Sequence, residues 1–187
     1  GAVNTQYSLF FEGGNLVFRN QGASFNINSS SIGFTNNAWH HVAATYDGAQ
    51  KKIYVDGALA GTQNYTGTFA TNTQGTIIGA YGAAGANAFF FNGKIDEVRI
   101  WNITRTKDEI AANMNNELCV IPSSVKAYYT FNHGIASGTN TSITTVTDLS
   151  GNVNTGTLTN FALTGSTSNW VTGQTLTPGA VVSSNNI

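Results

Sequence analysis

Short apolar segments separated by tight-turn dipeptides recur along the chain, and they constrain its fold more than any other feature. The dipeptides are Gly13-Gly14, Asp47-Gly48, Asp56-Gly57 and Asn92-Gly93, and each is suited to join two antiparallel strands. Asn92-Gly93 is the strongest of these signals and predicts a hairpin between its flanking segments. The expected strands are residues 7–11, 16–18, 23–28, 39–46, 51–55, 58–65, 75–79, 89–91, 94–101, 125–131, 143–148 and 155–159. So many short strands predict an all-β fold, an antiparallel sandwich of the jelly-roll type.

One segment has helical rather than alternating spacing. Thr106 stands three residues before Glu109, which is the arrangement of a capping box. Ile110, Met114 and Leu118 then recur at helical spacing. We therefore expect one short surface helix of about three turns, laid against the sandwich.

Length and composition limit the number of domains and indicate a cellular location. Its 187 residues suffice for one sandwich with its own core and are too few for two full domains. Only 9% of the residues are charged, against roughly 25% in a typical soluble domain, so neutral amides and hydroxyls must supply the polar surface. Such a surface suits a secreted or cell-surface module. The single Cys119 cannot form an intrachain disulfide.

The charge pattern and the apolar runs exclude two classes of partner. The net charge is −1, and the 8 basic residues are spread singly along the chain. This pattern lacks the basic stripe that phosphate neutralisation requires, so we expect no nucleic acid partner. No apolar run approaches the roughly 20 residues that cross a bilayer, so we expect no membrane span.

Three stretches carry a family likeness: NAWHHVAATYDG (37–48), IYVDGALAGT (53–62) and FFFNGKIDEVRIWNITRTKDEI (89–110). In order and spacing they resemble the laminin-G-like, or concanavalin-A-like, jelly-roll domains of bacterial surface proteins. The segments AYYTFN (127–132) and TDLSGNVNTGTL (147–158) resemble the element that usually opens such domains. Here this element follows the IDEVRIW strand, an arrangement similar to that of some large secreted proteins of the Bacteroidetes.

The resemblance also sets the expected domain limits. We expect a laminin-G-like domain over residues 1–172, with the displaced YYTFN element at 125–172 and a linker-like tail at 173–187. The opening strands of the family are not found in the chain. We therefore expect an incomplete sandwich, completed by strands from another chain or from an upstream segment. The face of Val125, Ala127, Tyr129 and Phe131 should then lack cover. The alternative is that short, divergent strands within residues 20–36 or 160–171 close the sandwich alone.

The resemblance implies a function only at the level of class, because this architecture serves lectins, adhesins and some enzymes. We expect a non-catalytic carbohydrate-binding or adhesion module of a larger secreted or cell-surface protein, whose partner is a glycan or a cell-surface protein. The alternative is a structural or protein–protein interaction module that acts as a spacer or docks a neighbouring domain.

Catalysis is not expected, because the acidic residues are poorly placed for it. Enzymes of this fold class keep two or three carboxylates at alternate positions of one strand. Asp96 and Glu97 are adjacent and point to opposite faces, while Asp47 and Asp56 occupy turns. His41 is the remaining candidate, and no nucleophile motif accompanies it, so we interpret it as a structural histidine.

A structural calcium ion is a further expectation that the resemblance supplies. In related domains an aspartate of the closing strand is often a ligand, and by resemblance that aspartate is Asp96. Asn132 ends the strand expected beside it, and Asp148 leads the DLSGNVN loop, which offers further oxygen ligands. The alternative for Asp148 is a cap on its own turn, through hydrogen bonds from the backbone at Ser150 or Gly151.

Sugar rings stack on aromatic side chains, so a glycan site needs an aromatic platform with polar groups around it. Tyr65, Tyr81 and Trp170 are the candidate ligand-binding residues. Each can equally be an ordinary packing residue at the rim of the sandwich.

Overall fold

The computed structural model describes residues 7–20, 23–28, 32–35, 37–69, 75–81 and 88–176, and in these ranges it contains antiparallel strands and a single short helix. This confirms the predicted all-β antiparallel fold. The strands are β1 (Ser8–Glu12), β2 (Asn15–Asn20), β3 (Ala23–Asn28), β4 (Val42–Tyr46), β5 (Gln50–Val55), β6 (Ala58–Asn64), β7 (Ala80–Tyr81), β8 (Ala88–Phe90), β9 (Val98–Trp101), β10 (Val125–Tyr129), β11 (Thr145–Val146) and β12 (Gly156–Thr157). The helix is α1 (Lys107–Asn113).

The chain forms two compact units. Unit 1 contains Gly1–Phe91 and Thr104–Met114, and unit 2 contains Asn92–Ile103 and Asn115–Ile187. The chain therefore leaves unit 1 after β8, returns to it for α1, and leaves it again. The predicted limits of a single domain at 1–172 stay a prediction, and residues 177–187 of the predicted tail lie outside the described residues.

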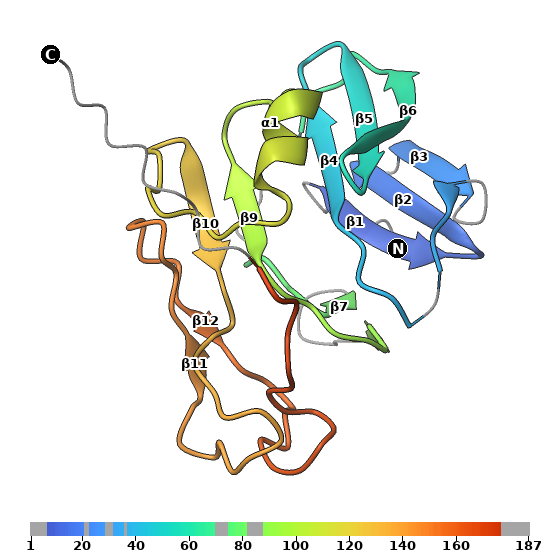
Figure 1. The fold of residues 1–187 in the computed structure, drawn as a ribbon. Coiled ribbons are helices and arrows are strands. Elements are labelled where there is room, and N and C mark those ends of the chain that lie inside the picture. The colour runs from blue at the N-terminus through green and yellow to red at the C-terminus, as the bar shows by residue number, and fades with distance from the viewer. Residues whose placement is uncertain are drawn as a thin grey trace, which may run out of the picture. The chain divides into compact units, whose positions relative to one another are not determined.

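Two three-stranded sheets form the sandwich of unit 1, with orders β1-β2-β3 and β4-β5-β6 (Figure 1). Gly13 and Gly14 turn β1 into β2 with φ of +56° and +76°, a conformation that favours glycine. The turns at 47–48 and 56–57 join β4 to β5 and β5 to β6, as predicted. The core lies between the two sheets and consists of Leu16, Phe18, Phe25, Ile53 and Val55.

The helix α1 begins as the sequence predicts and ends earlier. The Thr106 side chain accepts a hydrogen bond from Glu109 N–H, and the Glu109 carboxylate accepts one from Thr106 N–H, which completes the capping box. The predicted three turns are wrong, because the helix has only 7 residues. The Asn113 side chain donates to Glu109 O at 2.7 Å and so competes for a backbone acceptor of the helix. Two further asparagines follow at 115 and 116 and disfavour continuation.

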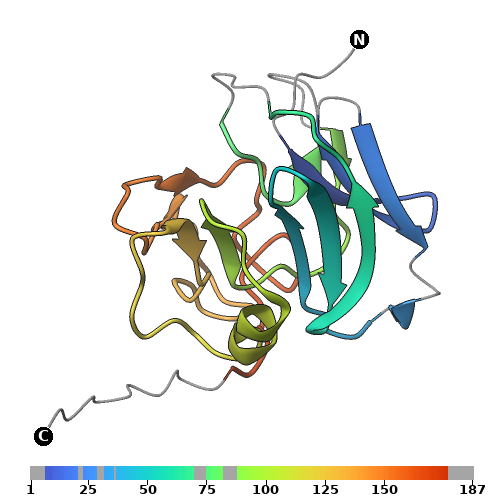
Figure 2. The ribbon, with the colours of Figure 1, turned by 90° about the horizontal axis from the view of Figure 1, so that it is seen from above.

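In unit 2, β9 and β10 form an antiparallel pair (Figure 2). Tyr129 opposes Val98. The predicted neighbourhood of the two strands is thereby confirmed, although β10 ends at Tyr129 and not at Asn132. The predicted Asn92-Gly93 hairpin is wrong, because β8 pairs with β7 and β9 pairs with β10. The strand predicted at 75–79 is also wrong, and the short β7 follows it at Ala80–Tyr81. The turn signal is overridden on one side by the preceding strand β7 and on the other by the distant strand β10.

The expectation of an uncovered face on the 125–131 strand is wrong. Val125, Ala127 and Tyr129 are 0%, 5% and 7% exposed. The free edge of β10 is also covered, because side chains of the 148–154 turn bind its backbone. Asn152 and Asn154 donate to Lys126 O at 3.4 and 2.8 Å. For the rest of the fold, completion by another chain or by an upstream segment stays a prediction.

Among the described residues, no helix is long and apolar enough to cross a membrane.

Candidate functional site

Three aromatic side chains from separate strands of unit 1 come together, and we call them the aromatic face: Phe10 of β1, Tyr81 of β7 and Phe89 of β8. The Phe10 and Tyr81 rings stack with centroids 5.3 Å apart and planes inclined by 16°. Phe89 lies 6.4 Å from Tyr81, tilted by 46°. The pairing of β7 with β8 places these last two rings side by side. Tyr81, one of the three aromatic candidates from the sequence, is thus the centre of a cluster.

Phe89 presents its ring to solvent at a cost in free energy. Phe89 is 81% exposed. Its backbone has a φ of +56°, in the left-handed region that bulky residues avoid. Phe90 and Phe91 are also exposed, at 62% and 47%. Burying one such side chain contributes about 1.5–3 kcal/mol, which these residues forgo in the isolated chain. Strain combined with exposure in this way is typical of a functional surface.

A pair of charged residues flanks the aromatic face. The Arg19 guanidinium lies 4.7 Å from the centre of the Phe10 ring, and it bonds the Glu12 carboxylate at 3.0 Å. Apolar rings are therefore bordered by hydrogen-bond donors and acceptors. A sugar ring has the complementary pattern, with an apolar C–H face and hydroxyls at its edge.

The other two predicted aromatic residues have packing contacts. The Tyr65 hydroxyl accepts a hydrogen bond from Asn20 Nδ2 at 2.9 Å, and the Lys51 ammonium lies 4.2 Å from its ring centre. The Trp170 indole donates to Phe131 O at 2.7 Å, and its ring lies against the backbone of Gly134. These contacts correspond to the alternative of rim packing, and neither residue belongs to the aromatic face.

Two of the three predicted calcium ligands have a common neighbour in unit 2. Asn132 donates to the Glu117 carboxylate at 2.9 Å, and the charge of Glu117 also acts on Asp96. Burial raises the pKa of the Asp96 carboxyl, and the negative charge of Glu117 adds to this effect. Backbone N–H groups of Gln174 and Glu97 donate to Asp96 and partly offset the rise. Glu117 was missed from the sequence, because nothing local places it near Asp96.

Asp148 is held by a different set of contacts. Its Oδ1 accepts hydrogen bonds from the N–H groups of Tyr128 and Ser150, both at 2.9 Å. Its Oδ2 accepts from the Ser150 hydroxyl at 2.8 Å and from Asn154 N–H at 3.0 Å. Four donors fill the lone-pair positions of a carboxylate, so this residue caps its turn and does not fit a calcium ligand without losing these bonds.

The calcium prediction therefore rests on Asp96, with Asn132 and Glu117 near it. In the described part of the chain, no three His, Cys, Asp or Glu side chains gather in a way that could hold a metal ion. Two carboxylates and one amide are few for an ion that takes about 6–8 oxygen ligands. Backbone carbonyls would have to supply the others, and calcium binding stays a prediction.

One set of contacts in unit 1 has the order of a hydrolytic triad. His40 Nδ1 lies 2.8 Å from Asp56 Oδ2, and His40 Nε2 lies 3.2 Å from the Thr35 hydroxyl. However, Thr35 N–H also donates to Nε2 at 3.1 Å, so Nε2 is already an acceptor and Nδ1 carries the proton. The ring cannot take a proton from the hydroxyl while it holds this bond. We interpret the contacts as a brace between the 35–41 loop and the β5–β6 turn.

Comparison with known proteins supports this description of the fold. A family model described as the concanavalin A-like lectin/glucanases superfamily matches residues 2–111. Pappalysin-1 of Mus musculus is 36% identical over 78 residues, which are 41% of this chain and 5% of that protein. Pappalysin-1 of Homo sapiens is 35% identical over 78 residues. The chain thus spans only a small part of these curated relatives.

A solved structure gives a broader match. The crystal structure of a candidate carbohydrate-binding protein from Bacteroides ovatus superposes with a TM-score of 0.59 and 26% identity. The match covers 78% of this chain and 40% of that one. The antiparallel strands of the structure agree with the matched family model, which covers more than half of the chain. This chain belongs to the Laminin_G_3 family of the concanavalin A-like lectin/glucanases superfamily.

Proposed function

We propose that this chain is a non-catalytic carbohydrate-binding module of a larger secreted or cell-surface protein, and that the aromatic face contacts the sugar. The observation that carries the proposal is Phe89, whose ring is 81% exposed on a left-handed backbone and lies beside Tyr81. A side chain in this conformation contributes little to the stability of the fold, and its apolar surface would be buried by a bound ligand.

The size of the contact is consistent with recognition rather than tight binding. One sugar ring that buries about 100 Å² of apolar surface gains about 2.5 kcal/mol, at about 25 cal/mol per Å². Sugar hydroxyls would accept hydrogen bonds from Arg19 and donate them to Glu12, which adds orientation. The structural similarity to the Bacteroides ovatus protein supports a glycan as the ligand class.

The absence of catalysis is part of the same proposal. Glycoside cleavage needs two carboxyl groups on either side of the scissile bond. Among the described residues, the acidic side chain that flanks the aromatic face is Glu12, which forms an ion pair with Arg19. Asp148 is occupied by four donors, and the Asp96 carboxylate accepts backbone hydrogen bonds from Glu97 and Gln174. Each of these three carboxylates is thus engaged by partners within its own unit.

A protein partner is the second candidate. The run of three exposed phenylalanines, Phe89 to Phe91, favours it, because such a patch can also dock an apolar protein surface. The module would then act in adhesion or as a docking domain.

A glycan array separates the two proposals. Wild-type protein should bind a defined group of glycans, and the Tyr81→Ala and Phe89→Ala variants should lose that binding. Phe161→Ala is the matched control, because Phe161 is 49% exposed and belongs to unit 2. A reducing-sugar assay on the bound glycans should show no turnover. Wild-type protein that binds no glycan contradicts the proposal and leaves the protein partner.

A further inference from the structure

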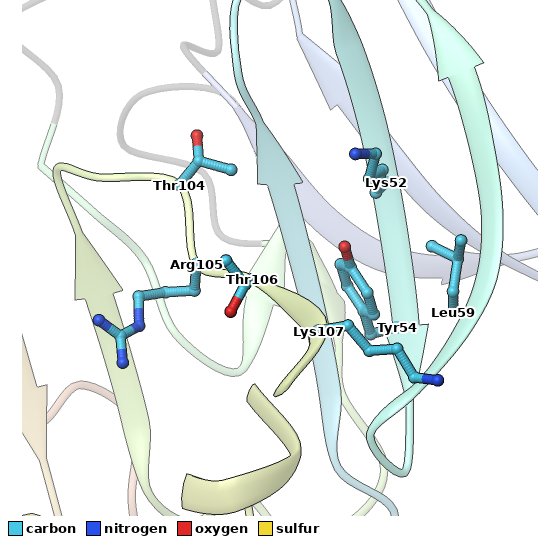
Figure 3. Close-up of a pocket in the computed structure, with 7 residues that line it drawn as sticks. All are labelled: Lys52, Tyr54, Leu59, Thr104, Arg105, Thr106 and Lys107. Atoms are coloured by element: carbon cyan, nitrogen blue, oxygen red, sulfur yellow. The ribbon is translucent and has the colours of Figure 1, made fainter. Parts of the chain in front are cut away.

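A second surface of unit 1 carries an open pocket away from the residues of the aromatic face (Figure 3). Its walls are Lys52 and Tyr54 of β5, Leu59 of β6 and residues 104–107, which lead into α1. The pocket has a volume of about 360 Å³, within the range of small-molecule sites. Tyr54 opposes Leu59 across the β5–β6 pair, so one rigid hairpin forms this wall.

The Tyr54 hydroxyl has no hydrogen-bond partner within the described residues, although Tyr54 is only 4% exposed. Figure 3 shows the hydroxyl directed toward Lys52, on the pocket side of the strand. The hydroxyl is not one of the buried side-chain atoms that lack a partner, so it opens into the pocket. A ligand in the pocket could therefore accept a hydrogen bond from it.

Two lysines, Lys52 and Lys107, line the pocket together with this hydroxyl. The nearest carboxylate to the Lys52 ammonium is Asp47, at 3.9 Å and partly exposed, which leaves the ammonium weakly paired. Lys107 has no ion-pair partner in the described ranges. Arg105 is turned away from Tyr54 in Figure 3 and pairs with Glu109 at 3.1 Å, so it does not compete for the pocket. The Glu109 carboxylate is likewise engaged by Thr106.

We propose that this pocket binds the anionic group of an acidic sugar, a uronate carboxylate or a sulfate ester. The ammonium groups of Lys52 and Lys107 face the anion, the Tyr54 hydroxyl donates a hydrogen bond to it, and Leu59 packs against the apolar side of the ring. The assignment to a sugar rests on the proposed function. The anionic character rests on the charges and the hydroxyl of the pocket itself.

Chemical-shift titration of the 15N-labelled chain tests the pocket directly. The probes are methyl β-D-glucuronide, galactose 6-sulfate and the neutral methyl β-D-glucoside. Either anion should shift the amides of residues 52–54 and 104–107, and the shifts should weaken as salt is added. The two anions separate the carboxylate from the sulfate. Equal shifts with the neutral glucoside, or anion-induced shifts elsewhere only, would overturn the proposal.

Two variants and a control sharpen the test. Lys52→Gln should weaken anion binding about tenfold, and Tyr54→Phe, which removes only the hydroxyl, should weaken it about fivefold. Lys94→Gln changes an exposed lysine of unit 2 and should leave binding unchanged. Unaltered affinity in both pocket variants contradicts the assignment.

The experiments distinguish an error in the pocket proposal from an error in the proposed function. If Phe89→Ala loses glycan binding while the pocket variants have no effect on any anion, the pocket assignment is wrong and the proposed function stands. If the small anions bind at residues 52–54 but Phe89→Ala leaves glycan binding intact, the aromatic face is wrong and the pocket stands.

Discussion

Replacing Asp148 by Asn tests whether this carboxylate anchors the free edge of β10. The change keeps one acceptor oxygen and the shape of the side chain. It places an NH2 group where Oδ2 accepts from Asn154 N–H at 3.0 Å and from the Ser150 hydroxyl at 2.8 Å. The hydroxyl can reverse its bond and accept, whereas the Asn154 N–H faces a donor and loses its acceptor.

The expected loss follows from these contacts. A hydrogen bond to a charged group contributes about 1.5–3 kcal/mol, and a buried donor without an acceptor costs about 1–3 kcal/mol. One bond is lost completely, and the two at Oδ1 lose their charge assistance. We therefore expect Asp148→Asn to lower the free energy of unfolding by about 3 kcal/mol at neutral pH.

The effect should also depend on pH in a defined direction. Burial by itself raises the pKa of the Asp148 carboxyl, but hydrogen bonds from Ser150 and Tyr128 outweigh it and leave the pKa below its ordinary value. A carboxyl with a lowered pKa in the folded state stabilises the protein fully above its unfolded pKa, and this stabilisation is lost as pH falls through the folded pKa. The difference between Asp148→Asn and wild type should be constant from about pH 6 to 8 and shrink below about pH 4.

Urea unfolding followed by tryptophan fluorescence measures this difference, because Trp101 and Trp170 both belong to unit 2. Asp108→Asn is the matched control, since Asp108 is exposed in the first turn of α1 and should cost about 0.5 kcal/mol or less. A loss below about 1 kcal/mol in Asp148→Asn, or one that does not change with pH, would refute the anchoring role.

Three other changes test separate parts of the structure. Thr106→Ala removes the capping box and should cost about 1 kcal/mol in thermal unfolding, with Thr106→Ser close to wild type; equal losses in both would contradict the cap. Lys51 is fully buried, and burial lowers its pKa, so its charged form destabilises the fold, and this cost shrinks as pH rises toward the unfolded pKa. Lys51→Met should therefore raise the urea midpoint at pH 7, and a lower midpoint would contradict this. Calcium, if Asp96 ligates it, should raise the melting temperature relative to chelator, and Asp96→Asn should remove the increase; identical wild-type curves with and without calcium would end the calcium proposal.

The parts of the fold that could be predicted are those that neighbouring residues determine. The turns at 13–14, 47–48 and 56–57 join strands only a few residues apart, so their sequence signals suffice. The N-terminus of α1 is equally local, because Thr106 and Glu109 satisfy each other. The turn signal at Asn92-Gly93 failed because β8 pairs with the preceding strand β7, while β9 pairs with β10, which lies much further along the chain.

In the candidate site, too, local features could be predicted from the sequence and contacts between distant residues could not. Tyr81 could be named from its loop composition, but Phe10 and Phe89 join it through strand pairings that the sequence does not reveal. The run of three phenylalanines carried an overlooked signal, since alternate residues of a strand face opposite sides and are all buried only where both faces of the strand are covered. Asp148 could be predicted to act as a cation ligand or a hydrogen-bond acceptor. However, the donors that bind its carboxylate include the backbone N–H of Tyr128, 20 residues away in the sequence.

Calorimetric titration with the glycan selected on the array measures whether the aromatic face binds carbohydrate. The titration compares wild type with Phe89→Ala, Phe89→Tyr and the Phe161→Ala control. We expect a dissociation constant about tenfold or more higher in Phe89→Ala, a loss of about 1.4 kcal/mol, with affinity retained in Phe89→Tyr and Phe161→Ala. Wild-type affinity in Phe89→Ala would show that the aromatic face does not bind the sugar.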